Sequence, residues 1–385
     1  MEIKQIASIV NTIQQEVLGD SAIVTEDLSQ IVDIGRKLFD AASYDKVTGK
    51  LVDHVGRVVF ASRPYTGRLL SVYRDGWEYG GALEKVRTVI TPASENESWQ
   101  LQDGQVYETN KYVQPKVEAR YYNMRTTLEY RQSIADRQLK SAFSSAEQLN
   151  GLLAMLDMGV RNSMTLGTEA LVKRAVNNMC AAAIHSASPL RAINLLAVYN
   201  TTTGSTLTAA AALRDRDFLR FATTEIDRKR RQMADFTALY NAAGAQTHTP
   251  LELQHVVMHD SLVYAIDNYL RADTYHDKLL ANPYGEIVTH WQGTGTSYSW
   301  QDSTAIDVLA NIPDEASPVA VKQSGIVAAI WDHEAIAVTN EEQRVTSHHV
   351  DSADFTNVWY KRDAGYLNAF DENFIVFYIA DQSAT

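Results

Sequence analysis

The longest helical pattern of the chain lies between residues 144 and 186. Apolar side chains recur there every three or four residues, so they share one face of a helix. They are Leu149, Leu152, Leu153, Leu156, Val160, Met164, Leu171, Val172, Ala175, Val176, Met179, Ala183 and Ile184. Ser144 and Glu147 fit a capping box at the start, and Gly167 is a position where the helix could bend or break. A helix of this span is about 60 Å long at ~1.5 Å per residue, which suits an elongated subunit better than a compact enzyme.

The first fifty residues carry two shorter helical patterns. Ile6, Ile9, Ile13 and Val17 recur at helical spacing, and a second stretch begins at Thr25, a residue type favoured at helix N-caps. These helices either pack on the chain's own core or cross to a neighbouring subunit.

Residues 55–134 are rich in β-strand patterns. We expect a strand at 58–61, a turn at 63–67, and two long strands at 83–90 and 116–130 that are separated by a polar excursion. A long hairpin this polar buries little apolar surface of its own and would be marginal in isolation. It therefore needs another surface to lie on, and a neighbouring subunit is the obvious candidate.

Residues 187–320 alternate helical and extended patterns, as an α/β subdomain does. A helix is expected at 215–236 and a strand at 254–259, followed by a helix at 261–270 with Asp260 as its N-cap. The apolar side of the first helix is formed by Phe218, Ala222, Ile226 and Met233.

The C-terminal segment is the part richest in aromatic residues. An apolar strand at 325–331 leads into a polar stretch, in which His348 and His349 are expected at a surface turn. The final strand, at 374–379, is apolar on both of its alternating faces, so we expect it to be covered on both sides. The long helix would be one cover, and the N-terminal segment or another subunit would be the other.

This C-terminal segment resembles the corresponding part of the major capsid proteins of tailed bacteriophages, the Hong Kong 97 type. The similar features are the apolar strand, a Thr-Asn-Val-Trp segment from Thr356, a Tyr-Leu-Asn turn at Tyr366, and a closing Asn-Phe-Ile-Val-Phe-Tyr strand from Asn373. The order of the earlier elements is also similar to that family, with an extended loop followed by a spine helix and an axial domain.

The resemblance implies an α+β fold of the Hong Kong 97 type with five parts. They are an N-terminal arm (1–54), an extended β-hairpin loop with the first peripheral-domain strands (55–134), the long spine helix region of the peripheral domain (135–186), an axial domain (187–320) and C-terminal peripheral-domain strands (321–385). The short stretch before the extended loop leads us to expect no N-terminal cleavage and a separate scaffolding protein.

The same resemblance implies assembly rather than catalysis. The chain is then expected to be a major capsid protein, which is a structural protein of the virion. Its hexamers and pentamers would self-assemble into an icosahedral shell around a double-stranded DNA genome. The implied partners are further copies of the chain, a scaffolding protein, a portal at one vertex, and packaged DNA held by proximity without sequence-specific binding. Assembly would take place in the host cytoplasm. An encapsulin-like protein compartment is the alternative within the same fold.

Composition and charge narrow the class of protein. With 385 residues, 45% of them hydrophobic, the chain is large enough for two subdomains with cores of their own. Its single cysteine, Cys180, excludes an intramolecular disulfide and fits synthesis in a reducing cytoplasm. A net charge of −12 argues against nucleic-acid binding by bulk electrostatics. No apolar run approaches the ~20 residues that span a bilayer, so we expect no membrane partner.

Histidines are the candidates for catalytic chemistry. His255 and His259 are four residues apart, with His248 upstream, and on a helix such a pair could share the metal ion of a hydrolase. The residues between them are typical of a strand, where the two side chains would stand about 13 Å apart, too far to share an ion. His348 and His349 would point to opposite faces of a strand and make a poor chelate. We therefore expect structural histidines, with no metal, cofactor or catalytic residue.

Three further motifs have simple interpretations. The basic run at 228–231 spreads around a helix axis, so a solvated face is expected, with contact to an acidic neighbour or to DNA as the alternative. Gly293 and Gly295 lack the third glycine and the lysine of a phosphate-binding loop. Cys180 lies in the apolar stripe of the long helix, so it is expected to be buried and inert.

Overall fold

The structure of the chain is a computed structural model. It describes residues 11–12, 69, 72–74, 83–88, 93, 95–107, 112, 114–122, 124–138, 146–271, 285–292, 302–312 and 315–381, with the backbone alone at 73–74, 83, 97, 146–157, 270–271 and 340–342. Several predictions lie outside the described residues: the N-terminal helices apart from 11–12, the strand at 58–61, the turn at 63–67, the cap at Ser144, and Gly293 with Gly295.

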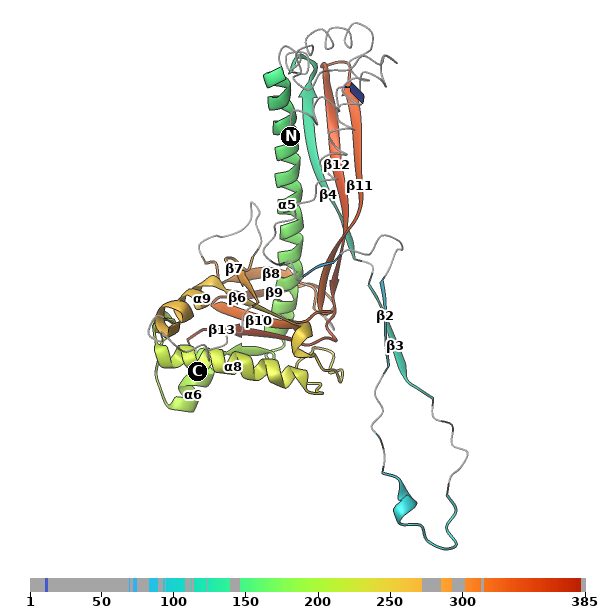
Figure 1. Cartoon of the computed structure of the whole chain (residues 1–385), viewed down its shortest axis with the longest axis vertical. Helices are drawn as coiled ribbons and strands as arrows, with labels where there is room; N and C mark the ends of the chain where they lie inside the picture. Colours follow the sequence, from blue (N-terminus) through green and yellow to red (C-terminus); the bar gives the residue numbers. More distant parts are fainter. Residues whose placement is uncertain are drawn as a thin grey trace.

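One long helix, α5 (Ala146–His185), runs along the molecule (Figure 1). Its 40 residues confirm the predicted helix, and Gly167 does not interrupt it. Gly167 and Gly159 instead face strand β4 (Arg125–Ala135), where an added Cβ would lie 3.3 Å from Leu128 Cδ1 and 3.0 Å from Tyr130 Oη, respectively. The glycines therefore let the helix and the strand approach each other closely.

Helix α5 lies beside a four-stranded sheet of the order β1-β11-β12-β4. Its other strands are β1 (Tyr73–Arg74), β11 (Ile336–Val350) and β12 (Phe355–Asn368); β1 is parallel to β11 and the remaining pairs are antiparallel. Two expectations are wrong here. His348 and His349 lie within β11 rather than at a turn, and Tyr366 lies within β12, so the chain turns only after Asn368.

A second sheet has five strands in the order β5-β13-β10-β6-β7. They are β5 (Ala192–Asn194), β13 (Phe374–Tyr378), β10 (Ile326–Asp332), β6 (Gln254–His259) and β7 (Glu286–Val288). The strand predicted at 254–259 is thereby confirmed. The C-terminal segment is divided between the two sheets, because β10 and β13 pair with strands of the 187–320 segment while β11 and β12 lie along α5.

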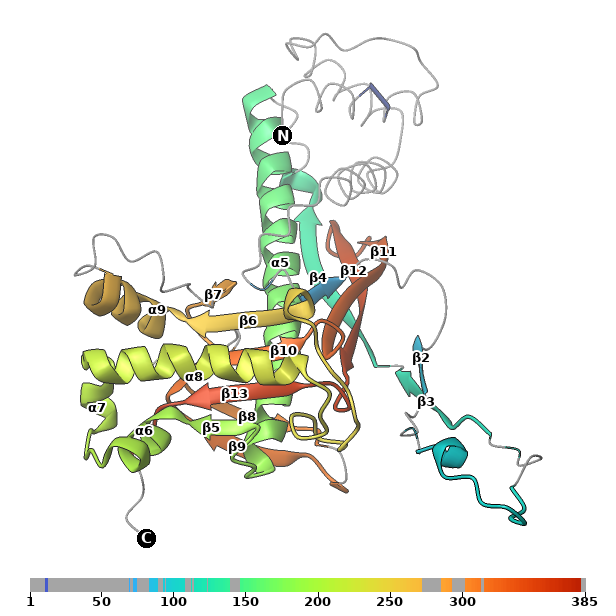
Figure 2. The ribbon, with the colours of Figure 1, turned by 60° about the horizontal axis from the view of Figure 1, so that its bottom comes forward.

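The final strand is buried on both faces, as its composition predicted. Phe374 and Val376 pack in one core with residues of α5, and Ile375 and Phe377 pack in a second core with Phe218. The second cover is made by helices of the same chain, α6 (Leu195–Thr203), α8 (Arg216–Ala234) and α9 (Asp260–Ile266), where we expected the N-terminal segment or another subunit (Figure 2).

Caps fix where these helices begin. Asp215 Oδ1 accepts a hydrogen bond from Phe218 N (2.7 Å), which starts α8. The N-cap of α9 is His259, whose Nδ1 accepts from Ser261 N at 3.2 Å, so Asp260 is the first helical residue and not the cap. A π-helical turn at Asp267–Arg271 follows. The remaining short elements are α7 (Ala209–Ala212), a 3-10 turn (Leu251–Leu253), β8 (Ile306–Ala310) and β9 (Val319–Gln323).

A hairpin of β2 (Leu83–Thr88) and β3 (Val117–Tyr122) projects from the body, away from the free end of α5 (Figure 1). The strand expected at 116–130 is thus split in two. Its first half pairs with β2, and its second half becomes β4 and joins β12. The far end of the hairpin carries a 3-10 turn at Glu97–Trp99.

Candidate assembly interface

The projecting hairpin exposes large apolar side chains. Trp99 and Val106, at its far end, are 95% and 96% exposed. Further exposed apolar residues on the hairpin are Val86, Leu101, Tyr112, Val117 and Tyr121. Because contiguous exposed apolar surface on a folded chain marks an interaction site, the hairpin is a candidate contact surface for another molecule.

Charged side chains join the base of the hairpin to the body. Lys85 Nζ lies 2.5 Å from Glu372 Oε1 and 3.3 Å from Glu334 Oε2. Arg87 Nη1 lies 3.7 Å from Asp371 Oδ2, and its Nη2 donates to the backbone oxygen of Gln246 at 2.8 Å. We call this group the base clamp; its members are Lys85, Arg87, Arg120, Tyr122, Glu334, Asp371 and Glu372.

The other two clamp residues on the hairpin, Arg120 and Tyr122, also contact Asp371. Arg120 Nη1 lies 3.8 Å from Asp371 Oδ1, and the Tyr122 hydroxyl donates to that oxygen at 3.3 Å. The turn that carries Asp371 is itself fixed by the body, since Ala369 N donates to Ala335 O at 2.8 Å and Ala242 N donates to Phe370 O at 2.9 Å. The clamp thus holds the hairpin to a rigid part of the molecule.

Burial and charge act against each other at the closest pair of the clamp. Burial alone would lower the pKa of Lys85, but the hydrogen bond to Glu372 and the charges of the neighbouring carboxylates raise it above its usual 10.5. Burial raises the pKa of Glu372 above its usual 4.5; Lys85 opposes this effect, and two nearby aspartates add to it. Lys85 is therefore charged at neutral pH, and its removal would leave buried carboxylates without their closest cation.

The base clamp is not predicted by the sequence patterns. The available signal was the alternation in 83–88, which places Lys85 and Arg87 on one face of a strand, together with the acidic pair Asp371 and Glu372 after an apolar strand. The two signals are separated by about 285 residues, so only the fold brings them together.

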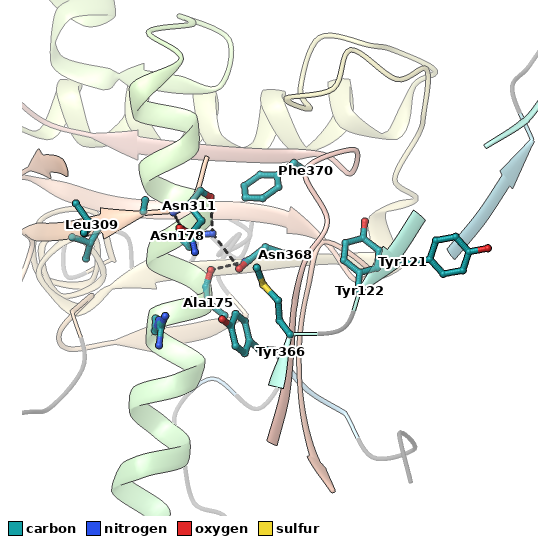
Figure 3. A pocket seen from close by; sticks show the side chains of 13 residues that line it. Tyr121, Tyr122, Ala175, Asn178, Leu309, Asn311, Tyr366, Asn368 and Phe370 are labelled. Atoms are coloured by element: carbon teal, nitrogen blue, oxygen red, sulfur yellow. Dashed lines mark hydrogen bonds between the residues drawn. The ribbon is translucent and has the colours of Figure 1, made fainter. Parts of the chain in front are cut away.

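A cavity of about 260 Å³ opens beside the clamp (Figure 3). It lies between the hairpin base, α5, β8 and the end of β12, and Tyr121, Tyr122, Tyr366 and Phe370 contribute aromatic rings to its wall. The guanidinium of Arg174 lies 5.6 Å from the centre of the Tyr366 ring. No local sequence pattern predicts this cavity, because its wall comes from four separate segments.

The amide groups in the cavity wall satisfy one another. Asn178 Oδ1 accepts from Asn311 N at 2.9 Å, and its Nδ2 donates to Asn311 O at 3.2 Å. Asn368 Nδ2 donates to Ala175 O at 2.8 Å (Figure 3). Because these polar groups already have partners, the cavity suits an apolar or aromatic group better than a polar ligand.

The three histidines considered for a metal site are not brought together. His255 Nε2 lies 2.7 Å from His333 Nδ1, His248 stacks on Phe236 with ring centres 5.4 Å apart, and the buried His259 points Nε2 at Thr289 O, 3.2 Å away. Burial lowers the pKa of His259 below its usual 6.5, so the ring is neutral at physiological pH. Within the described ranges, no three potential ligands cluster as a metal would need.

His349 also has partners in the sheet. Its Nδ1 lies 3.1 Å from Thr356 Oγ1, and its Nε2 lies 3.4 Å from Asp351 and 3.9 Å from Asp136. His348 is exposed. The two side chains are therefore in different surroundings although they are adjacent in the chain.

The basic run on α8 is only partly solvated. Arg228 and Arg231 are exposed and pair with Glu225 and Asp227 on the same helix. Lys229, in contrast, is largely buried and lies 5.7 Å from the centre of the Tyr240 ring. The predicted solvated face thus holds for the first and last residues of the run, while Lys229 belongs to the packed interior.

Cys180, a residue of α5, is fully buried in the core, as predicted, and burial raises its pKa to about 12. A thiol with this pKa is unreactive at neutral pH. Among the helices that the structure describes, none has the length and apolar character needed to cross a bilayer.

A family model matches nearly the whole chain. The model described as "Phi29-like phage major capsid protein" matches residues 10–378. The major capsid protein of Bacillus phage GA-1 is 25% identical over 130 residues, which are 33% of this chain. That match spans 26% of the relative, about a quarter of its length.

Solved structures with the same fold come from phage particles. A chain from the capsid structure of Staphylococcus phage Andhra has a TM-score of 0.53 and 13% identity, over 83% of this chain and 86% of that one. A chain from the structure of the head fiber and inner core protein gp22 of native bacteriophage P68 has a TM-score of 0.52 and 13% identity, over 82% and 85% of the two chains. These likenesses confirm the α+β fold of the Hong Kong 97 capsid type that the sequence predicted.

Proposed function

Since this chain belongs to the Phi29-like phage major capsid protein family, we propose that it is the subunit of a phage capsid. Many copies, arranged as hexamers and pentamers, close into an icosahedral shell around a double-stranded DNA genome. The observation that carries this proposal is the projecting hairpin, whose exposed Trp99 and Val106 require cover from a neighbour.

The role is structural and not enzymatic. The family and the fold support this conclusion, as does the pairing of His248, His255 and His259 with separate partners. The stability of the shell would come from many contacts between identical subunits. Each contact is modest, and the closed symmetry of the shell repeats it many times.

We propose the division into an arm (1–54), an extended loop (55–134), a spine region (135–186), an axial domain (187–320) and C-terminal strands (321–385). The pairing of the strands adds a detail to this division. β10 and β13 extend the sheet of the axial domain, and β11 and β12 make the ribbon along the spine helix. A load on the ribbon would therefore pass directly into the axial domain through continuous chain.

The proposed partners beyond the chain itself are a scaffolding protein, a portal at one vertex and the packaged DNA. A net charge of −12 supports a container that encloses DNA by geometry, without sequence-specific binding. The family places the chain in the virion; we propose that assembly occurs in the host cytoplasm.

Electron microscopy of the full chain tests this function. The chain is expressed alone and together with the proposed scaffolding protein, and the purified material is imaged in negative stain. We expect closed particles of uniform size. Single subunits or open aggregates under both conditions would refute the proposal.

A further inference from the structure

We propose that the cavity beside the hairpin base receives the tip of the hairpin of a second copy of this chain. The cavity is the 260 Å³ space between Tyr122, Asn178, Leu309 and Tyr366, and the tip is the segment 95–107. The inference rests on the proposed shell function and adds to it the site at which one subunit binds the next.

The tip is built to present an aromatic side chain. Trp99 closes a 3-10 turn and is almost fully exposed. The adjoining loop is held by a hydrogen bond from Gln102 N to the Tyr107 hydroxyl at 3.0 Å, and Gly104 provides the left-handed φ of 85° that the loop needs. A shaped loop that leaves Trp99 in solvent is expected to bury it elsewhere, because tryptophan is a preferred anchor of protein interfaces.

The cavity has the chemistry to accept such an anchor. Its wall is mainly apolar and aromatic, its amides are paired with one another, and Leu309 at its rim is 71% exposed. An indole that enters would gain apolar and aromatic contacts without leaving a buried amide unpaired.

Charge favours the same pairing. The tip, residues 95–107, carries three acidic side chains (Glu95, Glu97 and Asp103) and no lysine or arginine. Arg174 is exposed and is the single charged residue in the cavity wall. An acidic tip is repelled by most of a chain with a net charge of −12 and is attracted to this rim.

The geometry requires a second copy. The tip and the cavity lie at opposite ends of the same hairpin, so a chain does not fill its own cavity (Figure 1). A contact between the tip of one copy and the base of the next joins two different surfaces, and such head-to-tail contacts close into rings when the rotation allows. The proposal therefore also accounts for the ring-shaped grouping that hexamers and pentamers require.

Disulfide trapping in assembled particles tests the pairing. Gln100→Cys places a thiol beside Trp99 without removing it, and Leu309→Cys places one at the rim of the cavity; both positions are exposed, so folding is not at risk. The native Cys180 is buried and does not compete. Copper phenanthroline serves as the oxidant that accepts the two electrons of each disulfide. The control pair combines Gln100→Cys with Arg231→Cys, which is exposed on α8.

The outcomes separate this inference from the proposed function. A ladder of linked subunits, ending in covalent rings, from the Gln100–Leu309 pair but not from the control pair is the expected result. Particles in which the cavity pair remains unlinked, or in which both pairs link equally, would overturn the cavity assignment and leave the shell function intact. A failure of the unmodified chain to form particles would instead overturn the shell function.

A second set of variants does not depend on disulfide geometry. Trp99→Ala should raise the subunit concentration needed for assembly at least several-fold, and Trp99→Phe should stay close to the unmodified chain. Arg174→Glu should also raise it, and Glu95→Lys introduced into that variant should restore part of the loss. Equal assembly of Trp99→Ala and the unmodified chain would contradict the proposal.

Discussion

Gly325 joins the start of β10 to the residue that follows β13 through backbone groups alone. Its carbonyl accepts from Ile379 N at 2.8 Å, and its N–H donates to Thr304 Oγ1 at 3.0 Å. It has a φ of 74°, and an added Cβ would clash with the carbonyl oxygen of Ile379. The position therefore combines a conformation that favours glycine with a space that admits no side chain.

We expect Gly325→Ala to lower the free energy of unfolding by about 3 kcal/mol or more, since backbone strain adds to the steric overlap. Gly204 is the matched control: its φ is 67° and nothing lies within 4 Å of an added Cβ. Gly204→Ala should therefore cost only about 1 kcal/mol. Urea denaturation of the dissociated subunits measures both. Similar midpoints for the two variants would contradict this account.

His259 makes the stability of the subunit sensitive to acid. Burial lowers its pKa below 6.5, against the opposing effect of Asp260. As the pH falls through about 6.5, the unfolded chain takes up a proton at this position and the folded chain does not. The contribution of His259 is therefore complete above that pH and is lost as the pH drops toward the lowered pKa.

His259→Asn keeps an acceptor for Ser261 N and removes the titrating ring. We expect the variant to lose less stability than the unmodified chain as the pH falls below about 6.5, the usual pKa of histidine. Urea midpoints across this range give the comparison. Parallel curves for the two proteins would show that His259 is not responsible.

At the scale of elements, two glycines of α5 allow the helix to pack closely against β4. Gly159 and Gly167 face Tyr130 and Leu128 and leave room for the strand. Gly167→Leu should push β4 from the helix and cost about 1–3 kcal/mol, as overpacking does. Asn162→Leu adds the same side chain to the exposed face of α5 and should be close to neutral. Thermal unfolding followed by circular dichroism measures the pair; equal effects would exclude a role for the close approach.

The base clamp should determine the local stability of the hairpin without changing the stability of the body. Lys85→Met removes the closest cation from Glu372. Amide exchange in β2 and β3 should then accelerate by roughly 100-fold, which corresponds to the ~3 kcal/mol lost when one partner of a buried pair is removed. Exchange in β10 and β13 should remain unchanged.

Glu84 provides the control for this experiment. It lies on the same strand and bonds the Tyr121 hydroxyl on the exposed side of the hairpin, at 2.9 Å. Glu84→Gln should leave the exchange of β2 and β3 nearly unaltered, because exposed polar contacts contribute little. Unchanged exchange in Lys85→Met, or acceleration in both variants, would show that the clamp does not hold the hairpin.

Elements in which apolar residues recur at a regular spacing were predictable from the sequence. Contacts between distant segments were not. The stripe from Leu149 to Ile184 predicted α5, and the alternation at 374–379 predicted a strand covered on both faces. The second cover was assigned wrongly because nothing local in the sequence indicates that α8 packs on that face. The strand at 116–130 was read as continuous because its composition does not change where β3 ends and β4 begins.

The same limit applied to the candidate interface. The polar hairpin was recognised as unable to bury itself, and its exposed residues agree with that reasoning. The clamp and the cavity were missed because each is assembled from segments up to about 285 residues apart. Long-range charge pairs leave no period in a sequence, so only the fold identifies them.

At the scale of the whole molecule, the described residues form a packed body of sheets and helices and one hairpin, β2–β3, that projects from it. The five-stranded sheet finds its cover within the chain, where α5 packs on one face of β13 and α6, α8 and α9 pack on the other. The hairpin extends away from these cores and is held to them by the base clamp (Figure 1). We therefore expect the folded body and the exposed hairpin to have separate roles, the first in stability and the second in association.

Sedimentation of a shortened chain is the most direct test of that separation. Replacing 89–116 by an Asn-Gly turn keeps β2, β3 and the base clamp and removes the tip. In the presence of the proposed scaffolding protein, the full chain should sediment as closed particles, and the shortened chain should remain as folded single subunits at the same concentration. Equal assembly of the two chains, or a full chain that stays monomeric at every concentration, would contradict the central claim that the hairpin joins one copy to the next.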